Sequence, residues 1–215
     1  MIMFKPIRRH TAGFTLIEVL VALLIMAILS AMAFRGIEAV VRARDVAQAS
    51  TDRTLKLNTG ISQFEYDVSQ IVNSKVLPQA IMFDGATLRV ARRTPDGIQL
   101  VLWTLQDRRW QRWASGSFTH MSELTDAWMR SQQWDSISAG AVTVLDNVDT
   151  FQVYLCNPAN LATTGCSWNN VQSTQGAQAQ LPGGPAVQAI QPNAIRIALR
   201  VADGELTRER ELPRW

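Results

Sequence analysis

Hydrophobic positions along this chain follow three successive patterns. Residues 14–34 are almost entirely apolar, and a helix of that length spans roughly 30 Å, the thickness of a membrane's hydrocarbon core. Apolar residues at 57, 61, 64, 68 and 71 then alternate spacings of four and three, which is typical of one helical face. These patterns predict one helix from Phe14 to about Asn73, lipid-bound in its first half and packed on a sheet in its second. Gly36 and Gly60 lie inside it and are expected to weaken it locally and permit bends.

After Pro78 the period of the pattern shortens to two, which indicates strands. Segments 86–93, 98–105 and 109–115 are separated by turn signals around Gly97 and Asp107, and they predict a three-stranded meander. A short helix is expected over 122–133, with Ser122 as its cap. Segment 142–155 predicts one or two strands, and further strands are expected over 193–202 and 205–212.

Between Cys156 and Pro192 the chain is rich in Gly, Gln, Asn, Ser, Thr and Pro, so this segment is predicted to be a long loop. The fold class that follows is α+β, with a long N-terminal helix, hydrophobic in its first half, packed on antiparallel β-sheets.

The net charge of +3 comes from the residues before the apolar stretch. Lys5, Arg8 and Arg9 lie there, and without these three residues 18 basic side chains balance 18 acidic ones. The balance argues against a nucleic-acid partner. The same three residues predict a cytoplasmic N-terminus with the rest of the chain outside. A cleaved secretory signal, cut near Ser30-Ala31-Met32, is the alternative.

Cys156 and Cys166 are the only cysteines. In an extracytoplasmic domain we expect them to form a disulfide, which closes a short loop and stabilises the fold by roughly 2–3 kcal/mol. Two free buried thiols are the alternative.

The residues at the start of the apolar stretch read GFTLIE, from Gly13 to Glu18, behind a basic leader. This motif resembles the type IV prepilin class III signal. The resemblance implies cleavage after Gly13 by a prepilin peptidase and N-methylation of Phe14, with the apolar helix retained.

Glu18 is a carboxylate near the start of a segment built for lipid, where a charge is costly. The resemblance implies that Glu18 attracts the N-terminal amine of a neighbouring subunit during assembly, so that two costly charges are paired. Alternatively, Glu18 reaches the headgroups on the cytoplasmic side.

Catalytic and metal chemistry are poorly represented. His10 and His120 are the only histidines, which with two cysteines is too few for a usual zinc site. A histidine-based triad would have to use His120, and the serines near it in sequence do not make triad geometry. No catalytic residue, metal or cofactor is therefore predicted. The seven tryptophans offer three interpretations: a sheet core, an interface in which Trp110, Arg112 and Trp113 contact a neighbour or an exported substrate, or a surface that stacks single-stranded DNA. The balanced charge argues against the third.

Two further stretches, AFRGIEAVVRARD at 33–45 and FEYDVSQ at 64–70, resemble the J-type minor pseudopilins of type II secretion. This resemblance implies a single-pass protein of the bacterial inner membrane with a periplasmic C-terminal domain. The implied boundaries are a cleaved leader at 1–13, a transmembrane helix at 14–34, its periplasmic continuation at 35–74 and a β-rich domain at 75–215.

The implied role is a structural subunit, not an enzyme, at the tip of the secretion pseudopilus. Its implied partners are the I-type and K-type minor pseudopilins, the major subunit, prepilin peptidase, the inner-membrane assembly platform and an exported substrate. Cys156 and Cys166 depart from the J-type pattern and are more typical of type IV pilins. A minor type IV pilin in assembly, adhesion or motility is therefore the alternative, followed by a membrane-anchored periplasmic binding module.

Overall fold

The computed structural model describes residues 14–74, 77, 79–158, 166–170, 192–202 and 204–214. The chain divides into two units, Met1–Asp52 and Arg53–Trp215. Helix α1 (Leu16–Ser69) contributes to both of them. The predicted cleavage residue Gly13 lies outside the described residues.

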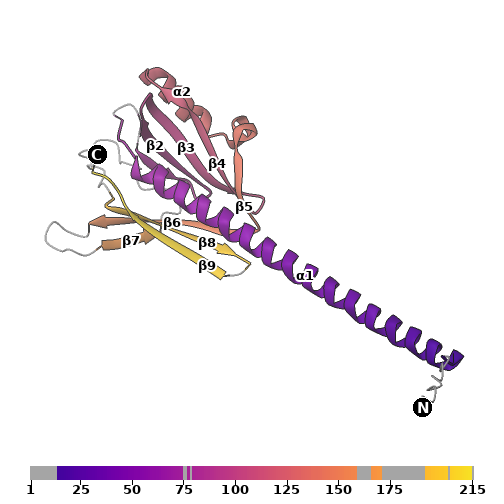
Figure 1. Cartoon of the computed structure of the whole chain (residues 1–215). Coiled ribbons are helices and arrows are strands. Elements are labelled where there is room, and N and C mark those ends of the chain that lie inside the picture. The colour runs from indigo at the N-terminus through magenta and orange to yellow at the C-terminus, as the bar shows by residue number, and fades with distance from the viewer. Residues whose placement is uncertain are drawn as a thin grey trace, which may run out of the picture. The chain divides into compact units, whose positions relative to one another are not determined.

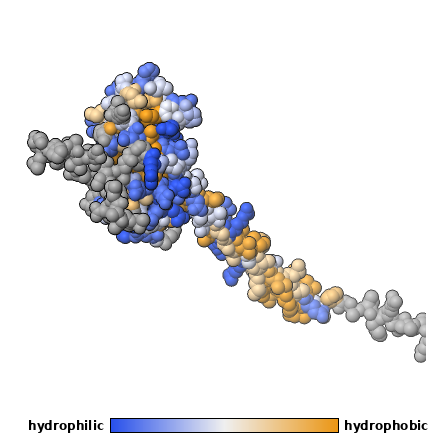
Figure 2. Space-filling view, turned by 90° about the vertical axis from the view of Figure 1, so that its left-hand side faces the viewer, coloured by the Kyte–Doolittle hydropathy of each residue, from blue (hydrophilic) through white to orange (hydrophobic). Residues whose placement is uncertain are grey.

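The described part of the first unit is the apolar segment of α1 and the polar turns that follow it. Its side chains are exposed throughout, and an 18-residue window of α1 has a mean hydropathy of 2.6. Figure 2 shows hydrophobic residues gathered along this part of the helix. Among the described residues, α1 is the one helix long and apolar enough to cross a membrane.

The single long helix predicted from the sequence is confirmed, although it ends at Ser69 and not near Asn73. It is unbroken at Gly36 and at Gly60. Gly60 is buried, and a Cβ placed there would lie 2.2 Å from Cγ1 of Val144 and 3.1 Å from the ring of Trp110. Gly60 is therefore a point where α1 approaches the sheet closely, because no side chain separates them.

Sheet A is an antiparallel meander in the order β1-β2-β3-β4-β5. The three strands predicted from the two-residue period are its centre, and β1 and β5 extend it on either side. Its strands are β1 (Ile81–Phe83), β2 (Thr87–Thr94), β3 (Gly97–Gln106), β4 (Arg109–Phe118) and β5 (Val142–Asp146).

Backbone conformations that favour glycine occur where the turn signals were placed. Gly97, the first residue of β3, has a φ of 138°, and Asp107 and Arg108, between β3 and β4, have φ values of 51° and 59°. Two consecutive residues of positive φ are typical of the tight hairpin turn whose twist matches that of the flanking strands.

Sheet B is antiparallel in the order β7-β6-β8-β9. Its strands are β6 (Val148–Pro158), β7 (Cys166–Asn170), β8 (Ala194–Val201) and β9 (Gly204–Glu211). The segment 142–155 thus forms two strands in different sheets, divided at Asn147, whose φ is 58°. The prediction of a loop throughout 156–192 is wrong at β7, where five residues pair with the end of β6.

Helix α2 (Met121–Ser131) covers the face of sheet A that is turned away from α1 (Figure 1). It was predicted over 122–133 with Ser122 as its cap, and the cap is wrong. His120 is the N-cap residue and provides no side-chain hydrogen bond there, whereas Ser122 lies inside the first turn. Two short 3₁₀ helices, Trp134–Ser136 and Ser138–Gly140, lead on to β5.

Two hydrophobic clusters hold the second unit together. In the larger one, residues of the last turns of α1 pack between the inner faces of the two sheets (Figure 1). Phe64 is 1% exposed and Val68 is 0% exposed, and burying each such side chain contributes about 1.5–3 kcal/mol. The smaller cluster joins α2 to the opposite face of sheet A through Leu124 and Trp128.

Candidate functional site

The N-terminal end of α1 is closed by a reciprocal pair of hydrogen bonds between Thr15 and Glu18. The backbone N–H of Thr15 donates to Oε2 of Glu18 at 2.9 Å, and the backbone N–H of Glu18 donates to Oγ1 of Thr15 at 3.4 Å. The Thr15 hydroxyl also donates to the same carboxylate oxygen at 3.0 Å. This is a capping box, which satisfies two backbone donors that a helix start leaves without intrahelical partners.

This cap gives Glu18 a role within its own chain that the sequence analysis missed. The signal was present in the T-x-x-E spacing of Thr15 and Glu18. The cap occupies one carboxylate oxygen, and Oε1 has no hydrogen-bond partner among the described residues. A carboxylate accepts about four hydrogen bonds, so Glu18 keeps the capacity to receive a further cationic donor. Phe14, just before the cap, is 87% exposed.

Comparison with known protein families adds to this geometry. Residues 8–34 match a family described as the prokaryotic N-terminal methylation motif. The chain therefore carries a prepilin-type N-terminal methylation motif at the start of α1. The matched residues include Gly13, Phe14 and Glu18, which carry the predicted processing and assembly steps. A search of curated proteins finds no match.

The last turns of α1 are joined to sheet A by a buried carboxylate, Asp67. Oδ1 of Asp67 accepts hydrogen bonds from the side chains of Gln63, Arg92 and Arg112 at 3.0, 2.8 and 2.9 Å. Its Oδ2 accepts from Nε1 of Trp103 at 2.9 Å and from Nε of Arg112 at 2.7 Å. Asp67 is fully buried, and the guanidinium groups of Arg92 and Arg112 are largely buried beside it.

This cluster fixes the orientation of α1 on sheet A, because its donors come from three neighbouring strands. Arg92 lies on β2, Trp103 on β3 and Arg112 on β4, so one carboxylate contacts the whole centre of the sheet. Arg112 binds it in a bidentate manner, the strongest geometry for such a pair. A buried carboxylate that has lost its water needs this number of donors to be tolerated.

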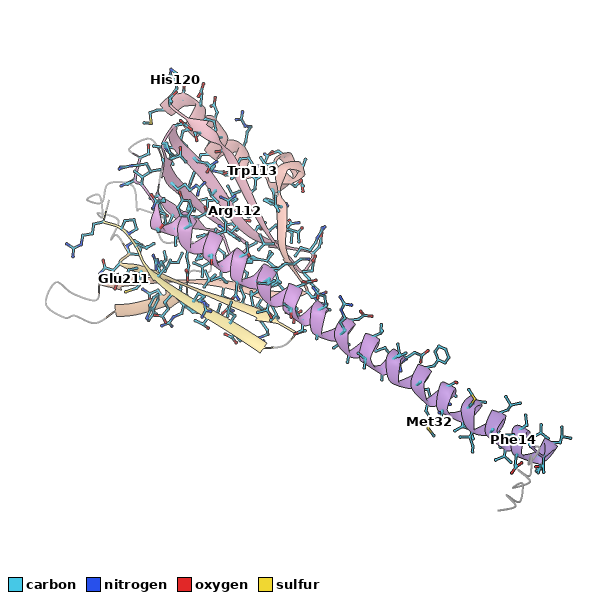
Figure 3. All side chains as sticks on the ribbon, viewed as in Figure 1. Phe14, Met32, Arg112, Trp113, His120 and Glu211 are labelled. Atoms are coloured by element: carbon cyan, nitrogen blue, oxygen red, sulfur yellow. The ribbon has the colours of Figure 1, made fainter. Side chains whose placement is uncertain are left out.

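The interface interpretation of the sequence RRWQRW is wrong for two of its residues. Trp110 is 0% exposed and packs against Trp103 with ring centroids 4.4 Å apart. Arg112 binds Asp67. Trp113, the neighbour of Arg112 on β4 (Figure 3), packs on the other face of the sheet beside the α2 cluster. The core interpretation holds for Trp103, Trp110 and Trp128, which are fully buried.

A second buried arginine, Arg89, connects α2 to sheet A. It donates to the carbonyl oxygen of Ser131 at 3.2 and 3.0 Å, at the end of α2, and it forms an ion pair with Asp84. Burial raises the pKa of Asp84, but hydrogen bonds from Arg89 and from the backbone N–H groups of Ala86 and Thr87 outweigh it and lower the pKa below its ordinary value.

The other residues singled out in the sequence have simpler surroundings. Cys156 is buried on β6 and is disulfide-bonded, while the side chain of Cys166 lies outside the described residues, so the pairing of the two remains a prediction. His120 is exposed beside Thr119. No group of three or more potential metal ligands occurs in the part of the chain that the structure describes.

Proposed function

We propose that this pilin-like protein is a minor pseudopilin of the J type, a non-enzymatic structural subunit at the tip of a type II secretion pseudopilus. The observation that carries the proposal is the methylation motif, which opens a continuous helix whose far end is built into a two-sheet domain. An anchor of this kind would tether a folded domain first to the membrane and then to a filament. We further propose the bacterial inner membrane as its location, with a cytoplasmic N-terminus and a periplasmic domain.

The stretch FEYDVSQ supports the J-type assignment because its residues attach α1 to the sheets. Phe64 and Val68 are buried in the main cluster, and Asp67 gathers donors from sheet A. The residues that resemble J-type pseudopilins are thus those that attach the helix to its domain, which gives the resemblance a physical basis. The exposed helix residues of AFRGIEAVVRARD leave that segment available to the other pseudopilins.

Assembly is proposed to begin with cleavage after Gly13 by prepilin peptidase and N-methylation of Phe14. The inner-membrane assembly platform would then extract the subunit, and Glu18 would receive the amine of a neighbouring subunit through its available oxygen. The I-type and K-type subunits and the major subunit are the proposed neighbours, and an exported protein is the proposed cargo.

A minor type IV pilin is the second candidate function, and the disulfide-bonded Cys156 favours it. Both candidates require the same processing, so they differ in the filament that receives the subunit.

Two measurements on the native host test these proposals. Mass spectrometry of the purified protein should find a mature N-terminus at methylated Phe14, and an N-terminus at Met1 would contradict the whole proposal. A deletion strain should lose release of exported proteins while it keeps piliation and surface motility. Loss of piliation with normal export would instead select the pilus. Complementation with Glu18→Leu should not restore the function that the deletion removes, although the protein accumulates normally.

A further inference from the structure

Strand β9 is the edge strand of sheet B (Figure 1), and all of its residues except the half-buried Leu206 are exposed. It pairs with β8 on one side, and none of the described residues forms a backbone ladder with its other side. A free edge of eight residues is a template for another strand, which proteins either block or use.

The two faces of β9 carry opposite charges. Glu205, Glu209 and Glu211 point to the outer face of sheet B, because they lie opposite Arg200, Arg196 and Ala194 of β8. Arg208 and Arg210 point to the inner face, because they lie opposite the buried residues Ile197 and Ile195. Figure 3 places Glu211 at the C-terminal end of this strand.

Two of the three glutamates on the outer face have ion pairs within the sheet, whereas neither arginine on the inner face has one among the described residues. Glu209 pairs with Arg196 at 2.6 Å and Glu205 with Arg200 at 3.5 Å. Neither Arg208 nor Arg210 has an ion-pair partner among the described residues, and both are exposed. Protection of an edge requires charges on it, but it does not explain why the ion pairs of β9 among the described residues all lie on its glutamate face.

A second copy of the chain fits this edge poorly. When two copies of one strand extend a continuous antiparallel sheet, residues on the same face lie opposite each other. A register centred on residue 207 sets Glu205 opposite Glu209, and one centred on residue 208 sets Arg208 opposite itself. A register centred on residue 209 sets Arg208 opposite Arg210, so each register that overlaps the two strands almost fully brings like charges together. Like charges directly opposite each other destabilise strand pairing. Pairing of β9 with the β9 of a second copy is therefore disfavoured, and pairing with a different chain is favoured.

We propose that β9 is the docking edge for an extended acidic segment of a different pilin-like subunit, which adds to sheet B as its next strand and sets carboxylates opposite Arg208 and Arg210. This inference rests on the proposed function, because it assumes that the protein meets other subunits in a filament. Such an edge would let the subunit bind a different chain through sheet B without binding copies of itself there.

Photocrosslinking of the full chain in the membranes of the native host tests the proposal. A photoreactive residue in place of Thr207, exposed at the middle of β9, should give an adduct with another pilin-like subunit, mapped to an acidic peptide. Arg208→Glu/Arg210→Glu should lower the yield of this adduct roughly tenfold. Arg93→Glu/Arg130→Glu, which makes the same charge change at exposed sites on sheet A and α2, should leave the yield unchanged.

Charge reversal in the partner completes the test. Changing the carboxylates of the mapped peptide to lysine should restore the adduct with Arg208→Glu/Arg210→Glu. An unchanged yield in that double variant, an adduct with the same chain, or an adduct with anionic lipid alone would overturn the inference. A photoreactive residue in place of Ile37, exposed on α1, distinguishes failure of the β9 docking edge from failure of the proposed function. Adducts from position 37 without adducts from position 207 refute the β9 edge alone, whereas no subunit adduct from either refutes the proposed function as well.

Discussion

Two tryptophans in contact with each other differ in one hydrogen bond, and this difference makes a quantitative prediction. Trp103 and Trp110 are both 0% exposed in the main cluster. Nε1 of Trp103 donates to Asp67 at 2.9 Å, whereas Nε1 of Trp110 is buried and has no hydrogen-bond partner among the described residues. Replacing each by phenylalanine removes the same atoms from the same cluster, so the packing losses are similar. The hydrogen bonding of the indole N–H therefore decides which variant is less stable.

Removing the indole N–H affects stability in opposite directions at the two positions. Trp103→Phe removes a hydrogen bond to a charged group, which costs about 1.5–3 kcal/mol. Trp110→Phe removes a buried donor that has no partner, and leaving such a donor unpaired costs about 1–3 kcal/mol in the native protein. We therefore expect Trp103→Phe to lower the free energy of unfolding by at least about 1.5 kcal/mol more than Trp110→Phe does.

The measurement is denaturant unfolding of the full chain in detergent, followed by circular dichroism because the substitutions alter tryptophan fluorescence. Equal losses for the two variants, or a larger loss for Trp110→Phe, would refute the reasoning. A double-mutant cycle of Trp103→Phe with Asp67→Asn provides the internal check, since its coupling energy should match the lost hydrogen bond, and the same cycle with Trp110→Phe should give a coupling near zero.

Three other predictions use the same unfolding measurement. Asp67→Asn should cost about 3–5 kcal/mol because it leaves two largely buried guanidinium groups without their carboxylate; Glu38→Gln, in an exposed pair, should change little, and similar losses for both would contradict the buried cluster. Gly60→Ala should destabilise by about 1–3 kcal/mol through overlap with β5, whereas Gly36→Ala, which meets nothing within 4 Å, should stabilise the helix by up to about 1 kcal/mol; the reverse order would disprove the close approach. The lowered pKa of Asp84 implies a contribution to stability that is present above its ordinary value of 3.8 and lost as the pH falls through the folded value. Asp84→Asn should therefore lower stability at neutral pH and flatten its decline in acid, and an unchanged acid profile would argue against this.

Much of the fold was predictable because periodicity reports burial directly. The helix of α1 and the meander β2-β3-β4 follow from spacings of 3.6 and two residues. The strand β7 was missed because its residues, CSWNN, have little of the hydrophobic alternation that marks a strand. The division of the strands between two sheets was also missed, since the break falls at the single residue Asn147.

The candidate site was predictable where it is local in sequence. The residues from Gly13 to Glu18 form one continuous motif, and a family comparison matches the same region. The Asp67 cluster was missed because its donors come from three separate strands, and no spacing in the sequence brings them together. The one available signal was an acidic residue on the apolar face of a helix, between Phe64 and Val68.

The cap at the start of α1 bears on what maturation changes in the molecule. Thr15 and Glu18, its two members, both lie on the retained side of the proposed cut. In the precursor and in the mature protein, α1 would therefore begin at the same residue. Removal of the leader would break a peptide bond without changing the fold of the helix start. The peptidase would release an amine beside a scaffold that is already in place, so readiness for assembly would depend on the new charge alone.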